Sequence, residues 1–172
     1  MQPISRRPWP VAPRPFDEEA FGSWLGRIAS RYQLSVTQAW EINQLGAFPA
    51  LTNAGWILFT PLPESTLEVI AMLARLDTER LARIQTPSEW MKDRTKLPYC
   101  FKCLVLNPAD VAAPRWKRRW FDPDIKGCEE HGTDLELIPA SIPRRARNID
   151  HLLSLVSKYR RRHSEAQWFR RY

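Results

Sequence analysis

The sequence is poor in the residues that build membrane segments, disulfide networks and phosphate-binding loops. Its longest apolar stretch, around residues 55–59, is far shorter than the roughly 18 apolar residues that identify a membrane-spanning helix. The six glycines are scattered along 172 residues and form no loop that could cradle a nucleotide. The N-terminal residues have no apolar segment like that of a signal peptide, and there are only three cysteines. We therefore expect no membrane contact and a reducing, cytoplasmic compartment.

Motifs of common zinc enzymes are also absent. There is no HExxH helix, and the zinc-deaminase pattern fails because no histidine precedes the Pro-Tyr-Cys segment at the required spacing. His151 and His163 have no carboxylate at a useful spacing. Asp122 and Asp124 could suggest a metal-dependent nuclease, but two acids in a turn are more often turn formers. The sequence predicts a protein that is not an enzyme.

All three cysteines fall in a single pattern with one histidine. Cys100 and Cys103 form one close pair, and Cys128 and His131 form a second pair 24 residues later. Each pair fits a tight turn, and four nitrogen and sulfur ligands close a structural zinc site with no open position for a catalytic water. The alternative is three buried free cysteines and a surface histidine. The matched second pair favours one structural Zn²⁺.

The positive charge is concentrated at the C-terminal end. Residues 144–172 hold nine basic and two acidic residues, which account for the whole net charge of +7. A concentrated basic segment is typical of a protein that binds a polyanion, although a solvated helix face is the simpler alternative. We predict contact with nucleic acid through this segment. Its basic residues are Arg144, Arg145, Arg147, Lys158, Arg160, Arg161, Arg162, Arg170 and Arg171.

A second basic group lies between the two ligand pairs. In residues 114–121, cations alternate with aromatic residues, a composition that can bind phosphates and stack on bases. The predicted nucleic-acid contacts here are Arg115, Lys117, Arg118 and Arg119. For Trp116 and Trp120 we favour burial in the core of the zinc module, because so small a module has little other apolar material.

The first hundred residues contain helical patterns. A helix is expected to begin at Asp17, with Glu18 and Glu19 in its first turn, where the helix dipole favours acids. Its apolar residues form one buried stripe, consisting of Phe21, Trp24, Leu25, Ile28 and Ala29. After a short turn, Ser35 and Gln38 form a capping box for a second helix. This outline is that of a helix-turn-helix.

A second helical pair is expected after an irregular stretch at residues 46–63. Ser65 and Glu68 form a further capping box, and Asp77 is the predicted N-cap of a short helix. Such pairs can read DNA, but more often they are compact helical packing. Neither pair presents an obvious basic recognition helix.

These patterns predict a mainly α protein with a small zinc-finger module. We expect an extended Pro- and Arg-rich arm at residues 1–15, followed by a helical, helix-turn-helix-like domain at 16–96. A zinc knuckle or ribbon follows at 97–140. Residues 141–172 are expected to form a basic amphipathic helix and tail.

Three segments, taken in order, resemble the TniQ family. Residues 15–29 resemble the opening of that family, in which a Pro-rich lead precedes an acidic stretch and a "SWLxRxA" helix. Residues 97–104 look like its "YCPxCL" motif. Residues 116–135 are similar to its "W…CPxHxxxL" motif. The resemblance covers most of the chain, although Phe101 and Glu129 stand where the family has proline.

The resemblance implies an accessory protein of DNA transposition that works in the bacterial cytoplasm. TniQ proteins do not cut DNA but link a target-recognition element to an AAA+ ATPase regulator, and short members occur in CRISPR-associated transposons. By this likeness Cys100, Cys103, Cys128 and His131 are the zinc ligands, and Trp24 and Arg27 help contact partners. A homodimer is left open.

The resemblance leads to one hypothesis and one alternative. The hypothesis is a non-catalytic targeting adaptor that joins a target-recognition complex, such as an RNA-guided CRISPR effector, to the ATPase. Its basic tail would touch the backbone of DNA or guide RNA, because no second zinc pair or long DNA-binding region follows residue 137. The alternative is a stand-alone helix-turn-helix and zinc-finger regulator of transcription that binds DNA.

Overall fold

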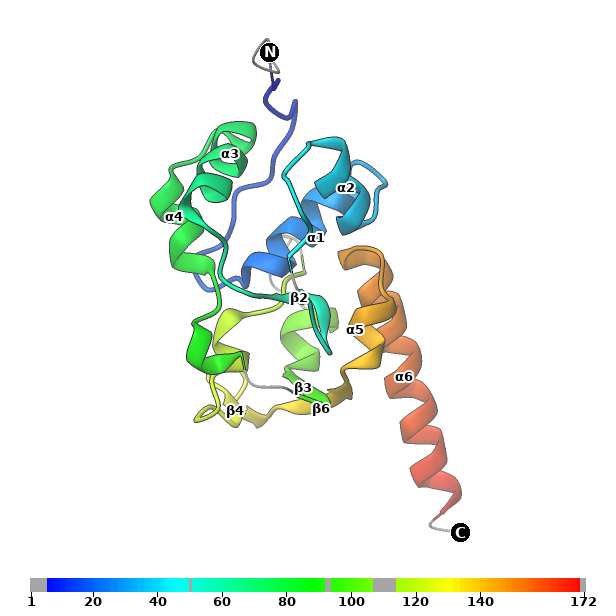
Figure 1. Cartoon of the computed structure of the whole chain (residues 1–172). Helices are drawn as coiled ribbons and strands as arrows, with labels where there is room; N and C mark the ends of the chain where they lie inside the picture. Colours follow the sequence, from blue (N-terminus) through cyan, green and yellow to red (C-terminus); the bar gives the residue numbers. More distant parts are fainter. Residues whose placement is uncertain (1–5, 50, 92–93, 107–113, 171–172) are drawn as a thin grey trace.

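The fold is built from helices arranged around a central helix, α1. The computed structural model describes residues 6–49, 51–91, 94–106 and 114–170. Figure 1 shows α1 (Phe21–Arg31) in the middle, with α2 (Val36–Ile42) on one side and the pair α3 (Glu64–Ala74) and α4 (Thr78–Ile84) on the other. Two further helices, α5 (Ser141–Arg145) and α6 (Ile149–Phe169), complete the chain. The mainly helical prediction is thus confirmed.

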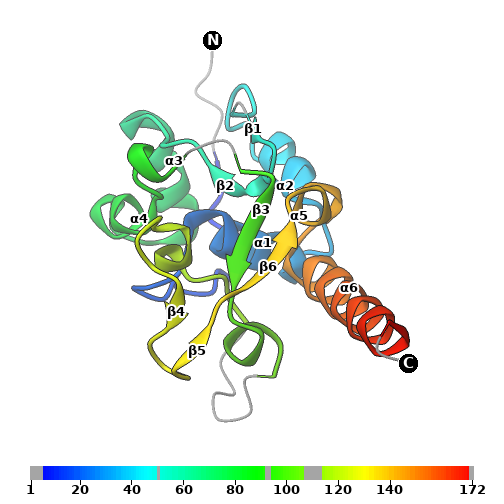
Figure 2. The same ribbon diagram turned by 90° about the horizontal axis from the view of Figure 1, so that it is seen from below.

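Short antiparallel strand pairs join the helices. β1 (Leu51–Thr52) pairs with β2 (Gly55–Phe59), and β4 (Gly127–Cys128) pairs with β5 (Thr133–Asp134). β3 (Lys96–Tyr99) pairs with β6 (Glu136–Pro139), with Leu97 opposite Ile138. Figure 2, seen from below, shows β3 and β6 side by side in front of α1. The remaining regular pieces are the short 3-10 helices Ser88–Trp90 and Arg118–Phe121 and a π-type turn at Lys102–Leu106.

Helix α1 begins at Phe21, four residues later than expected. The N–H of Ala20 bonds the carbonyl of Trp116, and Glu19 forms an isolated β-bridge with Lys117. Residues 17–18 form a turn, and these long-range bonds hold Glu19 and Ala20 outside the helix, so the acids do not lie in its first turn and that expectation was wrong. The predicted apolar stripe is buried as expected.

The stretch at residues 46–63 contains a buried strand that the sequence did not predict. All five residues of β2 are buried, because α1 and α5 both contact this strand. A continuous apolar run buried on both faces is compatible with a strand, but periodicity cannot reveal it. The approach is close: a Cβ on Gly22 of α1 would lie 2.2 Å from the carbonyl oxygen of Trp56.

The two predicted capping boxes have different outcomes. At α2, Ser35 Oγ accepts from the backbone of Gln38 at 3.0 Å, and Gln38 Oε1 accepts from the backbone of Ser35 at 2.9 Å, as predicted. At α3 the box is absent, because the helix begins at Glu64 with Pro63 as its N-cap and Ser65 lies inside the first turn. Asp77 is the N-cap of α4, but its side chain makes no capping bond.

The N-terminal arm is fastened to the helical body by tryptophans. The backbone N–H of Trp9 bonds the carbonyl of Leu73, and its indole N–H donates to Asn43 at 2.9 Å. The indole N–H of Trp24 donates to the carbonyl of Pro13 at 2.7 Å. Buried residues of the arm, the helices and the cysteine-containing segment therefore belong to one hydrophobic cluster.

Helix α6 projects from the body. Its first turns bury Ile149, Leu152 and Val156. From Arg161 to Ala166 every residue is exposed, and Figures 1 and 2 both show this end pointing away from the other helices. No helix in the described ranges is long and apolar enough to cross a membrane.

Candidate metal centre

The two ligand pairs are brought together by β3 and by the β4–β5 hairpin. Cys100 follows β3, and its carbonyl accepts the N–H of Leu104, which turns the chain so that Cys103 faces the same side. Cys128 ends β4, and its carbonyl accepts the N–H of Gly132 at 2.8 Å. Gly132 has a φ of 60°, a conformation that glycine adopts without strain, and this tight turn presents His131.

The four donor atoms lie close enough together to hold one metal ion. The three sulfurs and one histidine nitrogen all lie within 4.8 Å of one another. His131 Nδ1 lies 3.6 Å from the sulfur of Cys100, 3.2 Å from that of Cys103 and 3.5 Å from that of Cys128. The ligand atoms of tetrahedral zinc are separated by about 3.5–3.8 Å, given its bond lengths to sulfur and nitrogen. The separations are close to these values, so the cluster could hold a metal ion.

The thiols differ in their readiness to ionise. Burial raises the pKa of Cys103, and its hydrogen bond with the sulfur of Cys128 raises it further. Burial also opposes ionisation of Cys128, but hydrogen bonds with the side chain and backbone of His131 outweigh this effect and lower its pKa to about 7. A metal that binds all three sulfurs as thiolates must therefore displace protons, which makes binding pH-dependent.

An ion pair beside the cluster was not predicted from the sequence. Lys117 Nζ lies 2.6 Å from Glu130 Oε2, and that oxygen lies 3.5 Å from the sulfur of Cys103. Burial opposes the charge of Lys117, but Glu130 and Cys103 together raise its pKa. Three thiolates and a neutral histidine around a divalent ion carry a net charge of −1, which a nearby ammonium offsets.

The tryptophans between the ligand pairs are core residues. Trp116 is fully buried and Trp120 nearly so, which confirms the favoured prediction. The ring of Trp116 stacks on Phe121 with a centroid distance of 6.1 Å and also contacts Tyr99. The backbone N–H of Trp116 donates to Ser23 Oγ of α1 at 2.8 Å. The metal module is thereby bonded directly to the central helix.

The basic residues of the same segment have partners within the protein. Arg115 pairs with Glu18 at 2.7 Å and its guanidinium covers the ring of Phe16. Arg119 pairs with Glu129 at 2.7 Å. The side chain of Arg118 donates to the carbonyls of Arg83 and Gln85 at the end of α4. Because these cations and Lys117 already have partners, a nucleic acid would have to compete for them.

The basic residues of the C-terminal segment are mostly exposed. On α5 and just after it, Arg144, Arg145 and Arg147 are exposed, although Arg147 reaches Gln38 at 3.5 Å. Arg160 is half-buried and paired with Glu136. Arg171 lies outside the described residues. The other predicted contacts are exposed: Lys158, Arg161, Arg162 and Arg170.

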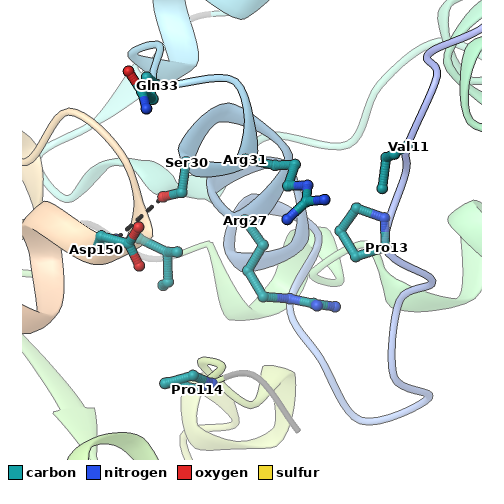
Figure 3. A pocket seen from close by; sticks show the side chains of 9 residues that line it. Val11, Pro13, Arg27, Ser30, Arg31, Gln33, Pro114 and Asp150 are labelled. Atoms are coloured by element: carbon teal, nitrogen blue, oxygen red, sulfur yellow. Dashed lines mark hydrogen bonds between the residues drawn. The ribbon is translucent and has the colours of Figure 1, made fainter.

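Trp24 and Arg27, the residues predicted to contact partners, lie inside the protein. Trp24 is fully buried. Arg27 forms a two-bond ion pair with the buried carboxylate of Glu19, at 2.7 and 2.8 Å, and also donates to the carbonyl of Arg14. Figure 3 shows Arg27 beside a hollow of about 610 Å³ that Pro13 of the arm also lines. Both residues hold the arm against α1.

Comparison with protein families gives a match over most of the chain. The family model described as TniQ matches residues 10–135, a span that contains α1 and all four residues of the metal cluster. Helices α5 and α6 lie beyond the matched residues. No curated protein matches the chain.

Proposed function

Because the chain belongs to the TniQ family, we propose that it is a non-catalytic adaptor linking a target-recognition complex to an AAA+ ATPase regulator of transposition. Membership identifies it as a transposition-associated targeting protein. The family match is the observation that carries the proposal, since it covers residues 10–135 and therefore the helices, the arm and the metal cluster together. In this role the protein works in the bacterial cytoplasm, and its partners carry out the chemistry.

We assign zinc to the cluster of Cys100, Cys103, Cys128 and His131. Four nitrogen and sulfur donors gathered at one point are typical of structural zinc, which cross-links the chain and does no chemistry. The cluster joins the segment after β3 to the β4–β5 hairpin, and Trp116 between them bonds α1. The ion thereby fixes the module against the helical body and makes one docking platform.

For nucleic acid, the arrangement of charge favours the C-terminal segment over the metal module. The module's cations are paired with acids or carbonyls, whereas most of those on α5 and α6 face solvent. Exposed cations release counterions when they meet phosphates, and this gives sequence-independent affinity. We propose that the exposed arginines of α6 contact the backbone of DNA or of a guide RNA.

Trp24 and Arg27 would then act on partners indirectly. Both hold the N-terminal arm against α1, so the arm, rather than these two side chains, would present itself to the ATPase or to a second copy of the chain.

A reconstituted transposition assay tests the proposal. The gene would be deleted from its transposon and supplied in trans, and insertion would be counted with the ATPase and transposase present. We expect loss of targeted insertion on deletion and co-purification of the ATPase with the intact protein. Unchanged insertion without the protein would overturn the adaptor role.

Footprinting on random DNA fragments separates the adaptor from the transcriptional regulator. A regulator selects a short motif through a recognition helix in the major groove. An adaptor that contacts only the sugar-phosphate backbone of DNA should protect no preferred motif. Selection of one motif by the protein alone would favour the regulator.

A further inference from the structure

A hollow of about 670 Å³ lies beside α4. Helix α4 itself lies on the far side of the molecule from α6 (Figures 1 and 2). It is formed by the end of α4, the residues that follow it and the 3-10 helix of the metal module. Three arginines, Arg80, Arg83 and Arg118, line it together, although Arg118 is distant from the other two in sequence. Asp17 is the one acid among the residues that line this hollow.

The arginines retain donors for a further acceptor. Arg80 donates one bond to the carbonyl of Pro15 at 2.8 Å, but its Nε is buried and has no hydrogen-bond partner among the described residues. A buried donor without a partner costs free energy that an incoming acceptor would recover. Asp17 makes no hydrogen bond to Arg80, because its carboxylate lies 4.0 Å from a terminal nitrogen of that guanidinium and is 90% exposed.

Arg118 and Arg83 differ in the hydrogen bonds that they make. Arg118 donates through one nitrogen to the carbonyls of Arg83 and Gln85, which caps the C-terminal end of α4 and offsets the negative end of its dipole. The side chain of Arg83 is exposed and has no partner within the described part of the chain. The hollow therefore keeps an excess of positive charge after its internal bonds are made.

The walls of the hollow narrow the choice of ligand. Beside the arginines lie Pro61, Ile84 and Pro87, which give it apolar sides. A single concave site with apolar walls suits a carboxylate next to an apolar side chain. A nucleic-acid backbone needs cations along an extended track, as on α6. Arg also binds carboxylates with two parallel hydrogen bonds.

We propose that this hollow binds an acidic segment of a protein partner, with Arg80 and Arg83 receiving its carboxylates. The inference rests on the proposed adaptor function for the existence of that partner. It places a protein-binding face opposite the nucleic-acid-binding helix, so that one molecule can hold both at once.

The test uses the full-length, zinc-loaded protein and a defined probe. An acetylated octapeptide of alternating Glu and Leu is titrated while the Nε–H signals of the arginines are followed by NMR. We expect the signals of Arg80 and Arg83 to shift and Arg83→Gln to weaken binding by about tenfold, the effect of losing a charge-assisted hydrogen bond of roughly 1.4 kcal/mol. Arg31→Gln, which removes an exposed arginine from α1, is the matched control and should bind as the wild type does.

Two outcomes would overturn the inference. One is a peptide titration that leaves both signals unmoved. The other is an oligothymidylate that moves the same signals and displaces the peptide, which would make the hollow a phosphate site. The titration needs no transposition partner, so it can succeed where the insertion assay fails. If the peptide binds but deletion of the protein leaves insertion unchanged, the adaptor function is refuted and the binding site stands.

Discussion

The guanidinium of Arg160 on α6 lies over the ring of Phe101, 3.7 Å from its centroid. Phe101 is inside the first ligand pair, between Cys100 and Cys103, at the position where the TniQ motif has proline. The Nε of Arg160 also donates to both oxygens of Glu136, at 3.2 and 3.1 Å. The basic helix is therefore fastened to the turn that carries the metal ligands.

Phe101→Ala should loosen α6 without releasing the metal. The substitution removes a cation–π contact worth about 0.5–1 kcal/mol, while the ligands stay in place. We expect faster amide exchange over residues 157–165 and unchanged zinc content. Lys102→Ala, at the exposed neighbour, should change neither. Equal exchange in Phe101→Ala and wild type would mean that this contact does not hold the helix.

Cys103→Ser should abolish stoichiometric zinc and destabilise the whole fold. Structural zinc contributes about 10–16 kcal/mol to the folding of small zinc modules, and Cys103 is one of the four residues that could hold the ion. A loss of only ~4 kcal/mol would lower the Tm of a chain this long by roughly 8–16 °C. Elemental analysis and thermal melting followed by circular dichroism measure the two effects. Glu129→Gln, beside Cys128, is the control. A Cys103→Ser protein with the same Tm as this control would contradict the assignment.

Arg27→Met should cost roughly 3–5 kcal/mol, because it leaves the carboxylate of Glu19 buried without its cation. Adding Glu19→Gln to that variant should recover part of the loss, since the uncompensated charge is removed. Chemical denaturation of Arg27→Met, of Glu19→Gln and of the double variant measures the coupling. Arg31→Met, one turn later and exposed, should stay within about 0.5 kcal/mol of wild type. Strictly additive effects would argue against the buried pair.

Tyr99 should remain protonated in alkaline solution. Burial, together with the neighbouring Glu136 that accepts its O–H at 3.0 Å, raises its pKa far above the ordinary 10.0. A raised folded-state pKa means that this stabilisation is complete below pH 10 and is lost only as the pH rises toward the folded pKa. Tyr99→Phe should therefore not reduce the phenolate absorbance gained up to about pH 11. Loss of one tyrosine's amplitude would show that Tyr99 ionises normally.

Arg161→Gln combined with Arg162→Gln should weaken binding to a random-sequence DNA duplex. Both side chains are exposed, and removing two phosphate contacts should reduce the salt slope by roughly 2. The Tm should not change. Arg115→Gln with Arg119→Gln, whose guanidiniums pair with Glu18 and Glu129, is the matched control and should leave the slope as it is. Fluorescence anisotropy at several salt concentrations distinguishes the two double variants.

Local patterns in the sequence predicted several features correctly. The spacing of Cys100, Cys103, Cys128 and His131 indicated one cluster, because each pair needs only a tight turn to face inward. The capping box of Ser35 and Gln38 lies within one turn of helix and is therefore readable without tertiary information.

Other features depended on residues that are far apart along the chain. From its sequence β2 was expected to be irregular, and it is a strand because α1 and α5 pack against it. Helix α1 starts later than predicted because Glu19 and Ala20 bond the segment of Trp116 and Lys117. No local preference of the acidic residues reveals those partners. The hollow at Arg80 and Arg83 needed Arg118 from the metal module to complete it.

The amino-acid sequence was enough to predict the cysteine–histidine set that could hold a metal, the helix-rich fold, the family and the excess of positive charge at the C-terminal end. Which of these positive charges are available depends on the folded structure. Arg115, Arg119 and Arg160 are as basic in sequence as Arg161 and Arg162, but the first three meet carboxylates from distant segments. Composition gives the charge of a side chain, whereas its availability depends on which acids the fold brings within bonding distance.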